Sequence, residues 1–183
     1  MSEWKEYKKL EISGSFLVSG FSIYLLEIKY KDELLFYVGM TGDPFYPSAR
    51  AAFHRISGHL ELSKHSTQNQ LMLALRLKGI KDAEFHKISI TMHHYPIDGF
   101  KKWPYSDMKA DTIKSNQNTS AYKEYKKVQQ KVENLEEALI YELRKNEINI
   151  LNKTDGKDIN FGKEFKPIFD DIIKKTNERV ERI

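Results

Sequence analysis

Two apolar runs joined by a short polar link constrain the fold of this chain more than any other feature of its sequence. Residues 21–30 and 34–39 are rich in β-branched, aromatic and aliphatic side chains, which favour strands. The link between them, Lys31-Asp32-Glu33, has the length of a hairpin connection. We therefore predict an antiparallel pair of strands, followed by a turn at Gly42.

The rest of the chain has the periodicity of several helices and of one more strand. The strongest helical pattern places apolar residues at spacings of three and four from Val128 to Leu143. The predicted elements are helices over 49–62, 68–78, 121–146 and 165–180, a strand over 85–92, a loop over 95–119 and an extended segment over 148–152. This order predicts an α/β fold, a small α/β sandwich in which helices flank a central three-stranded antiparallel sheet.

Composition favours one domain with a substantial core and excludes several kinds of site. Of the 183 residues, 40% are hydrophobic and none is cysteine. The lack of cysteine excludes disulfides, thiolate zinc sites and cysteine nucleophiles. No stretch approaches the roughly 20 apolar residues that span a bilayer, and the first residues lack the apolar core of a signal peptide. We therefore expect a cytoplasmic protein that does not enter a membrane.

Positive charge is concentrated in one part of the chain. The whole chain carries a formal net charge of +4, whereas residues 101–131 alone carry +5. Lysines in this stretch, among them Lys123, Lys126 and Lys127, are interleaved with tyrosine and tryptophan. One interpretation is a solvated helix and loop. The other is a surface that contacts phosphates, because lysine–phosphate contacts supply most of the non-specific affinity for nucleic acids.

Two tyrosines on the predicted hairpin are candidates for chemistry. Tyr24 lies on the first strand and Tyr37 on the second. Either one alone is typical of strand packing with its hydroxyl at the rim. A hairpin can bring both phenols to one place, however. Gly39 and Gly42 would leave room beside them for another backbone or a phosphate.

The first predicted helix carries two arginine–histidine pairs. Arg50 and His54 are four residues apart, as are Arg55 and His59, so each pair shares one face of the helix. Such a pair is usually a solvated face. It also suits a phosphodiester, because arginine neutralises developing charge and histidine transfers a proton. His65 follows, in the loop that opens the second predicted helix.

The long predicted helix places a carboxylate on its apolar face. Glu136 shares the face of Leu139, Ile140 and Leu143, whereas Glu137 points about 100° away. An unpaired buried charge is costly, so Glu136 needs a metal ion or an arginine as partner. The alternative is a glutamate at the edge of the apolar stripe with its carboxylate in solvent.

Taken in order, these residues resemble the motifs of the GIY-YIG nuclease family. The matching elements are Ser22-Ile23-Tyr24, Tyr37-Val38-Gly39, Arg55 with His59, Glu136 with Leu139-Ile140, and Asn149. They span residues 21–151, most of the chain. The resemblance implies a nuclease domain over 21–152 with a basic insert at about 95–125. An N-terminal extension over 1–20 and a C-terminal helical extension over 153–183 would flank this domain.

The sequence departs from the family pattern in the first tripeptide and after the long helix. Ser22 stands in place of a glycine, and the proline expected before the terminal asparagine is missing. Glu136 and Asn149 are one residue further apart than the pattern. Glu137 as the ligand would restore the spacing but would break the match to Leu139-Ile140, so we prefer Glu136.

The resemblance implies hydrolysis of DNA phosphodiester bonds with one divalent metal ion, Mg²⁺ or Mn²⁺, held by Glu136. Tyr24 would deprotonate or position the attacking water, and Tyr37 would assist from the facing strand. A phenol can act as a base when a cation lowers its pKa. Arg55 would bind the scissile phosphate, and His59 would relay a proton or make a second phosphate contact.

Substrate contacts are expected from residues around this centre. Asn149 would hold the substrate or the geometry of the metal site, and Gly39 and His65 would lie against the substrate. The basic segment with Lys123, Lys126 and Lys127, together with the C-terminal helix, would contact DNA. The Arg50–His54 pair remains a competing register for Arg55–His59. The alternative functions are a non-catalytic nucleic-acid-binding module on the same scaffold and a small α/β interaction domain.

Overall fold

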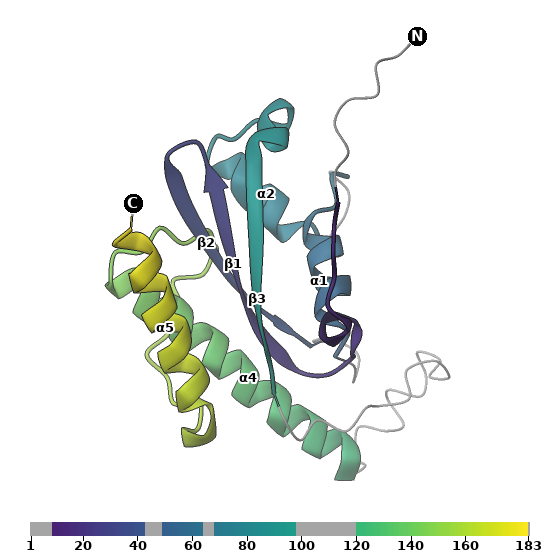
Figure 1. The fold of residues 1–183 in the computed structure, drawn as a ribbon. Coiled ribbons are helices and arrows are strands. Elements are labelled where there is room, and N and C mark those ends of the chain that lie inside the picture. Colours follow the sequence, from purple (N-terminus) through teal and green to yellow (C-terminus); the bar gives the residue numbers. More distant parts are fainter. Residues whose placement is uncertain (1–8, 43–48, 64–67, 98–119, 183) are drawn as a thin grey trace.

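The computed structural model describes residues 9–42, 49–63, 68–97 and 120–182, and within them it contains one three-stranded sheet (Figure 1). The strands are β1 (Ser22–Tyr30), β2 (Glu33–Thr41) and β3 (Ile88–Pro96). Their order is β2-β1-β3, and both pairings are antiparallel. The predicted hairpin and the predicted mixed α/β class with a three-stranded antiparallel sheet are therefore confirmed.

The third strand lies further along the chain than its pattern predicted. It begins at Ile88, after a 3₁₀ turn over Asp82–Lys87, and runs to Pro96. β3 pairs with β1 over all nine residues, from Tyr30 opposite Ile88 to Ser22 opposite Pro96. The length of β1 therefore sets the length of β3. Because β3 is an edge strand, its polar residues near Tyr95 fit a strand although their composition resembles a loop.

Helices cover both faces of the sheet. The helices are α1 (Ala52–His59), α2 (Gln70–Leu77), α4 (Ser120–Lys145) and α5 (Lys166–Val180). Alternate residues of β1 point to opposite sides: Leu26 packs in the cluster that includes α2, and Leu25 packs in the cluster that includes α4 and α5. Among the described helices, none is both long and apolar enough to cross a membrane.

The segment after α4 extends the sheet at the free edge of β2. Ile150 forms a parallel bridge with Phe36. The Phe36 amide donates to the Asn149 carbonyl at 2.9 Å, and the Leu151 amide donates to the Phe36 carbonyl at 2.7 Å. Residues 151–154, which follow this pairing, form one wall of a pocket whose other walls come from β2, α2 and α4.

The C-terminal helix is held against the sheet by apolar packing and by an ion pair between partly exposed Arg179 and buried Glu27. Ile172 of α5 is fully buried in the cluster that contains Leu25 and Leu135. Arg179 donates from Nε and Nη2 to the two carboxylate oxygens of Glu27 on β1, at 2.9 and 2.7 Å. Residues of the predicted C-terminal extension thus belong to the same core as β1 and α4.

Candidate active site

The ring of Tyr24 lies over Gly39 on the neighbouring strand. The two residues are direct partners in the β1–β2 register. A Cβ atom at position 39 would overlap the Cζ and Oη atoms of Tyr24. Glycine is therefore needed at this position to make room for the phenol. The prediction that Gly39 also contacts substrate stays a prediction.

The Tyr24 hydroxyl meets the last residue of α1. Its Oη lies 2.7 Å from Nε2 of His59, and both side chains are buried. Burial and the nearby charge of Arg55 lower the pKa of His59 to about 4, so the imidazole is neutral at pH 7. In a neutral imidazole that accepts at Nε2, the proton lies on Nδ1. That Nδ1 is buried and has no hydrogen-bond partner among the described residues.

Tyr37 places a second aromatic ring against His59. It lies two residues before Gly39, so it projects from the same face of the sheet as Tyr24. The ring of His59 meets both tyrosines edge-on, with centroid separations of 5.9 Å to Tyr24 and 5.2 Å to Tyr37. The predicted convergence of the two phenols is therefore present, as a diagonal pair across the hairpin.

Arg55 supplies positive charge beside Tyr24, Tyr37 and His59. Burial and the charges of Tyr37 and Glu136 raise the pKa of Tyr24, whereas the charge of Arg55 and its hydrogen bond to Tyr24 lower it. Burial and Glu136 also raise the pKa of Tyr37, and Arg55 again opposes them. The Nε atom of Arg55 is buried and, within the described chain, has no hydrogen-bond partner.

The competing arginine–histidine pair lies apart from the tyrosines: Arg50 precedes the start of α1, and His54 lies in its first turn. Arg50 Nη1 and His54 Nε2 are 3.3 Å apart in an exposed contact. Arg55 and His59, by contrast, interact electrostatically with each other and with the buried tyrosines. The structure thus brings the second pair, Arg55 and His59, to the candidate site.

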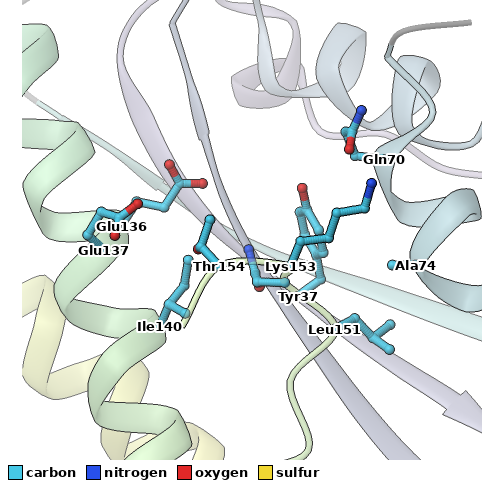
Figure 2. Close-up of a pocket in the computed structure, with 10 residues that line it drawn as sticks. Tyr37, Gln70, Ala74, Glu136, Glu137, Ile140, Leu151, Lys153 and Thr154 are labelled. Carbon is cyan, nitrogen blue, oxygen red and sulfur yellow. The ribbon is translucent and has the colours of Figure 1, made fainter. Parts of the chain in front are cut away.

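Glu136 reaches the site from α4, on the other side of the β2 edge. Burial raises its pKa to about 8; the charge of Arg55 lowers it, and the charges of Glu137 and Glu133 raise it further. Together with Tyr37, Glu136 lines a pocket of about 280 Å³ (Figure 2). Glu137 lines the same pocket and lies 3.9 Å from Lys157. The electrostatic coupling to Tyr24, Tyr37 and Arg55 favours Glu136 as the functional carboxylate.

The asparagine that borders the pocket differs from the one expected from the sequence. Asn149 is exposed, and its side chain accepts a long contact of 3.4 Å from Lys78 Nζ. Asn152 is buried, lines the pocket and forms two hydrogen bonds to the backbone at the edge of β2. Its Oδ1 accepts from the Val38 amide at 2.9 Å, and its Nδ2 donates to the Val38 carbonyl at 2.8 Å. A polar residue directly after the apolar pair Ile150-Leu151 was the available signal.

Sequence reasoning also missed other residues of the pocket wall. Gln70 and Ala74 come from α2, whereas Lys153 and Thr154 come from the segment after α4. Gln70 and Ala74 lie on a predicted helix, and Lys153 and Thr154 lie in a stretch without a period. Only the tertiary arrangement places all four beside Tyr37.

The predicted DNA-contacting lysines lie on the first turns of α4. Lys123, Lys126 and Lys127 are exposed, and Lys126 donates to Gln129 Oε1 at 2.6 Å. They precede Glu136 by 9 to 13 residues, roughly 14–20 Å along a helix. His65 and residues 98–119 of the predicted insert lie outside the described residues.

The donor chemistry of the pocket suits a hard cation. Glu136 offers carboxylate oxygens inside a recess, and Mg²⁺ typically binds through one or two carboxylates plus waters and substrate phosphates. The described residues contain no cluster of three or more histidine or acidic side chains that could form a closed metal cage. A cation held by Glu136 would therefore keep open coordination positions.

Replacing Gly39 with alanine is expected to displace Tyr24 from His59. The added methyl group overlaps a ring that is fully buried, so the ring can move only by repacking the core. Overpacking of this kind typically costs about 1–3 kcal/mol of unfolding free energy, measurable by urea denaturation. Gly14→Ala is the control, because a Cβ there meets nothing within 4 Å. Equal stability of the two variants would contradict the described seat of the Tyr24 ring.

Comparisons with models of protein families, with curated proteins and with solved structures found no significant match.

Proposed function

We propose that this chain is a metal-dependent endonuclease that hydrolyses DNA phosphodiester bonds, as its resemblance to the GIY-YIG nucleases implies. One observation carries the proposal: two tyrosines, an arginine, a histidine and a glutamate from four separate elements form one electrostatically coupled group. Each of these five residues was chosen from the sequence, by its spacing together with the resemblance to the family motifs. An accidental motif gives no reason for the five side chains to come together, two of them, Tyr37 and Glu136, at a pocket.

The proton path begins at Tyr24. Its O–H lies 2.7 Å from the neutral Nε2 of His59. As an attacking water gives a proton to the Tyr24 oxygen, the hydroxyl proton passes to His59. The water oxygen then forms a bond to phosphorus, and the bond from phosphorus to the leaving oxygen breaks. Burial keeps the free phenol protonated, so proton transfer to His59 avoids forming an isolated phenolate.

Arg55 would bind the scissile phosphate and neutralise the charge that develops on it. Its charge contributes to the low pKa of His59. A phosphate bound at Arg55 would offset that charge and raise the basicity of the imidazole at the moment it is needed. The divalent metal ion held by Glu136 would supply Lewis-acid stabilisation of the phosphate oxygens.

Cleavage of supercoiled plasmid in the presence of Mg²⁺, Mn²⁺ or EDTA tests the proposal. The wild type is expected to cut only with a metal ion. Glu136→Gln should lose at least about 100-fold in rate, because a metal ion contributes several kcal/mol to stabilising the transition state. Glu142→Gln is the control, since Glu142 is on the same helix but pairs with Lys145 at 3.6 Å.

Three results would contradict parts of the proposal. Wild-type rates for Glu136→Gln would refute the metal ligand. Cutting in EDTA would refute the metal requirement. DNA binding by the wild type without cleavage of varied DNA substrates would instead indicate a non-catalytic nucleic-acid-binding module.

A further inference from the structure

The pocket wall across from Glu136 carries a lysine that the proposed chemistry does not use. Lys153 lies on the segment after α4, and its side chain extends past Tyr37 toward Gln70 of α2 (Figure 2). An ammonium group, an amide and the Thr154 hydroxyl thus border the recess that holds the glutamate. These groups suit an anion next to the reacting phosphate.

The backbone on both sides of Lys153 is held in place. Arg144 of α4 donates to the Asn152 carbonyl at 2.5 Å and to the Thr154 carbonyl at 3.2 Å. The Asn152 side chain clamps Val38. These contacts fix the backbone from which the lysine side chain projects. The exposed side chain of Lys153 therefore projects from a fixed backbone position at the pocket.

Gly156, three residues after Lys153, allows the chain to lie directly against the backbone of α4. A Cβ at Gly156 would overlap the Tyr141 amide and would lie 2.5 Å from the Glu137 carbonyl. The Lys157 amide also donates to the Glu137 carbonyl at 3.1 Å. The segment that carries Lys153 therefore lies tightly against α4.

A second lysine, Lys78, lies at the end of α2 that is further from the pocket. Gln70, Ala74 and Lys78 are spaced by four residues, so they share one face of α2. Lys78 Nζ lies 3.4 Å from Asn149 Oδ1. The 149–153 segment thus runs beside α2, with Lys78 at one end and Lys153 by the pocket at the other. Neither lysine forms an ion pair with an acidic group of the described chain.

The spacing of these two cations suits one strand of nucleic acid. Eight residues separate Gln70 from Lys78, which is roughly 12 Å of helix. One DNA strand rises about 3.4 Å per nucleotide along the duplex axis, so this length spans several successive phosphates. Lysine acts as a point charge, which positions a backbone without reading its sequence.

We propose that one DNA strand leaves the active site along α2, with a phosphate beside the scissile one bound by Lys153 and a phosphate further along bound by Lys78. This inference rests on the proposed nuclease function and adds the path of the strand. The two lysines are positioning residues: they hold the substrate backbone so that the scissile phosphate lies at Arg55 and Glu136.

The first test measures DNA binding in EDTA, where the proposed cleavage does not proceed. Affinity of the Lys78→Gln/Lys153→Gln variant for a short duplex is measured by fluorescence anisotropy at several salt concentrations. Each lost phosphate contact reduces the slope of log affinity against log salt by about 1, so the double variant should lose about 2. Lys29→Gln is the matched control, because this exposed lysine of β1 points to the same side of the sheet as Leu25, away from α2.

The second test locates the contacts by scanning the cleaved strand with single neutral methylphosphonate linkages. In the wild type, neutral linkages on one side of the cut should slow cleavage by about tenfold. In Lys153→Gln, a neutral linkage nearest the cut should no longer slow cleavage. In Lys78→Gln, the same should hold for a neutral linkage further from the cut. Equal sensitivity of wild type and variants at every linkage would overturn the inference.

The two levels of the proposal fail in different ways. An unchanged salt slope in the double variant, with a wild type that binds and cuts DNA, overturns the strand path and leaves the nuclease intact. A wild type that neither binds nor cuts DNA overturns the nuclease and the strand path together.

Discussion

Replacing Tyr24 with phenylalanine is expected to lower the rate of DNA cleavage by about 10²–10⁴-fold, the usual contribution of a general base. The variant keeps the ring that fills the space above Gly39, but it loses the hydroxyl that lies 2.7 Å from His59. DNA affinity should change little, because the hydroxyl is buried and proposed to act on the attacking water. Single-turnover cleavage and anisotropy in EDTA measure the two quantities separately.

Tyr30→Phe provides the matched control for this substitution. Tyr30 lies on the same strand and in the same apolar cluster as Tyr24, roughly 20 Å away along the strand. Tyr24→Phe leaves the buried Nε2 of His59 without its partner, which costs about 1–3 kcal/mol of stability. Thermal unfolding therefore has to show that the variant is folded at the assay temperature.

The pairing of Tyr24 with His59 can be tested by a double-mutant cycle. If the two act as one proton-transfer unit, Tyr24→Phe combined with His59→Ala should be no slower than the worse single variant. Additive losses would mean that His59 acts separately, as the second phosphate contact that the family resemblance also allows.

Replacing Arg179 with methionine is expected to lower the free energy of unfolding by about 1–3 kcal/mol at pH 7, because it leaves the carboxylate of Glu27 without its two charge-assisted hydrogen bonds. Glu27 is 1% exposed and receives two hydrogen bonds from Arg179. His93 Nε2, at 3.5 Å, is a weaker neighbour. Urea denaturation of the variant and the wild type measures the difference.

The control for this stability measurement is Arg182→Met, since Arg182 is 68% exposed and lies 3.9 Å from Glu178. Exposed pairs contribute about 0–1 kcal/mol. Adding Glu27→Gln to Arg179→Met should recover part of the loss by removing the buried charge. Equal losses for the two arginine variants would show that Glu27 does not depend on Arg179.

The pH dependence of stability should change sign between the wild type and Arg179→Met. Burial alone would raise the pKa of Glu27, but Arg179, with help from His93, holds it below the ordinary value of 4.5. In the wild type this stabilisation is present above pH 4.5 and is lost as the pH falls through the folded-state pKa. Without Arg179, burial raises the pKa, so stability should instead decrease as the pH rises above about 4.5.

Local pattern predicted most elements of the fold because each pattern follows from a single element. Alternating and apolar runs mark β1 and β2, and the spacing from Val128 to Leu143 marks α4. The third strand was misplaced because its limits follow from pairing with β1, a long-range interaction. Residues 153–183 were interpreted as a C-terminal helical extension of the domain, and α5 within them packs on the same core as α4.

Some residues of the candidate site could be predicted from the sequence and others could not. Tyr24, Arg55, His59 and Glu136 could be chosen from the sequence because their spacing made them candidates and their order resembles the motifs of the GIY-YIG family. Asn152 was missed in favour of Asn149, since only the bridge to β2 decides which asparagine is buried.

The sequence by itself determined the elements, the apolar faces and the chemical types of the candidate residues, because these depend on neighbours within one helix or hairpin. The tertiary structure alone decided that the phenol of Tyr24 lies over Gly39 and that Lys153 and Gln70 border the pocket. Those facts depend on how separate elements pack. Packing is set by side-chain shape across the whole core, and no local spacing encodes it.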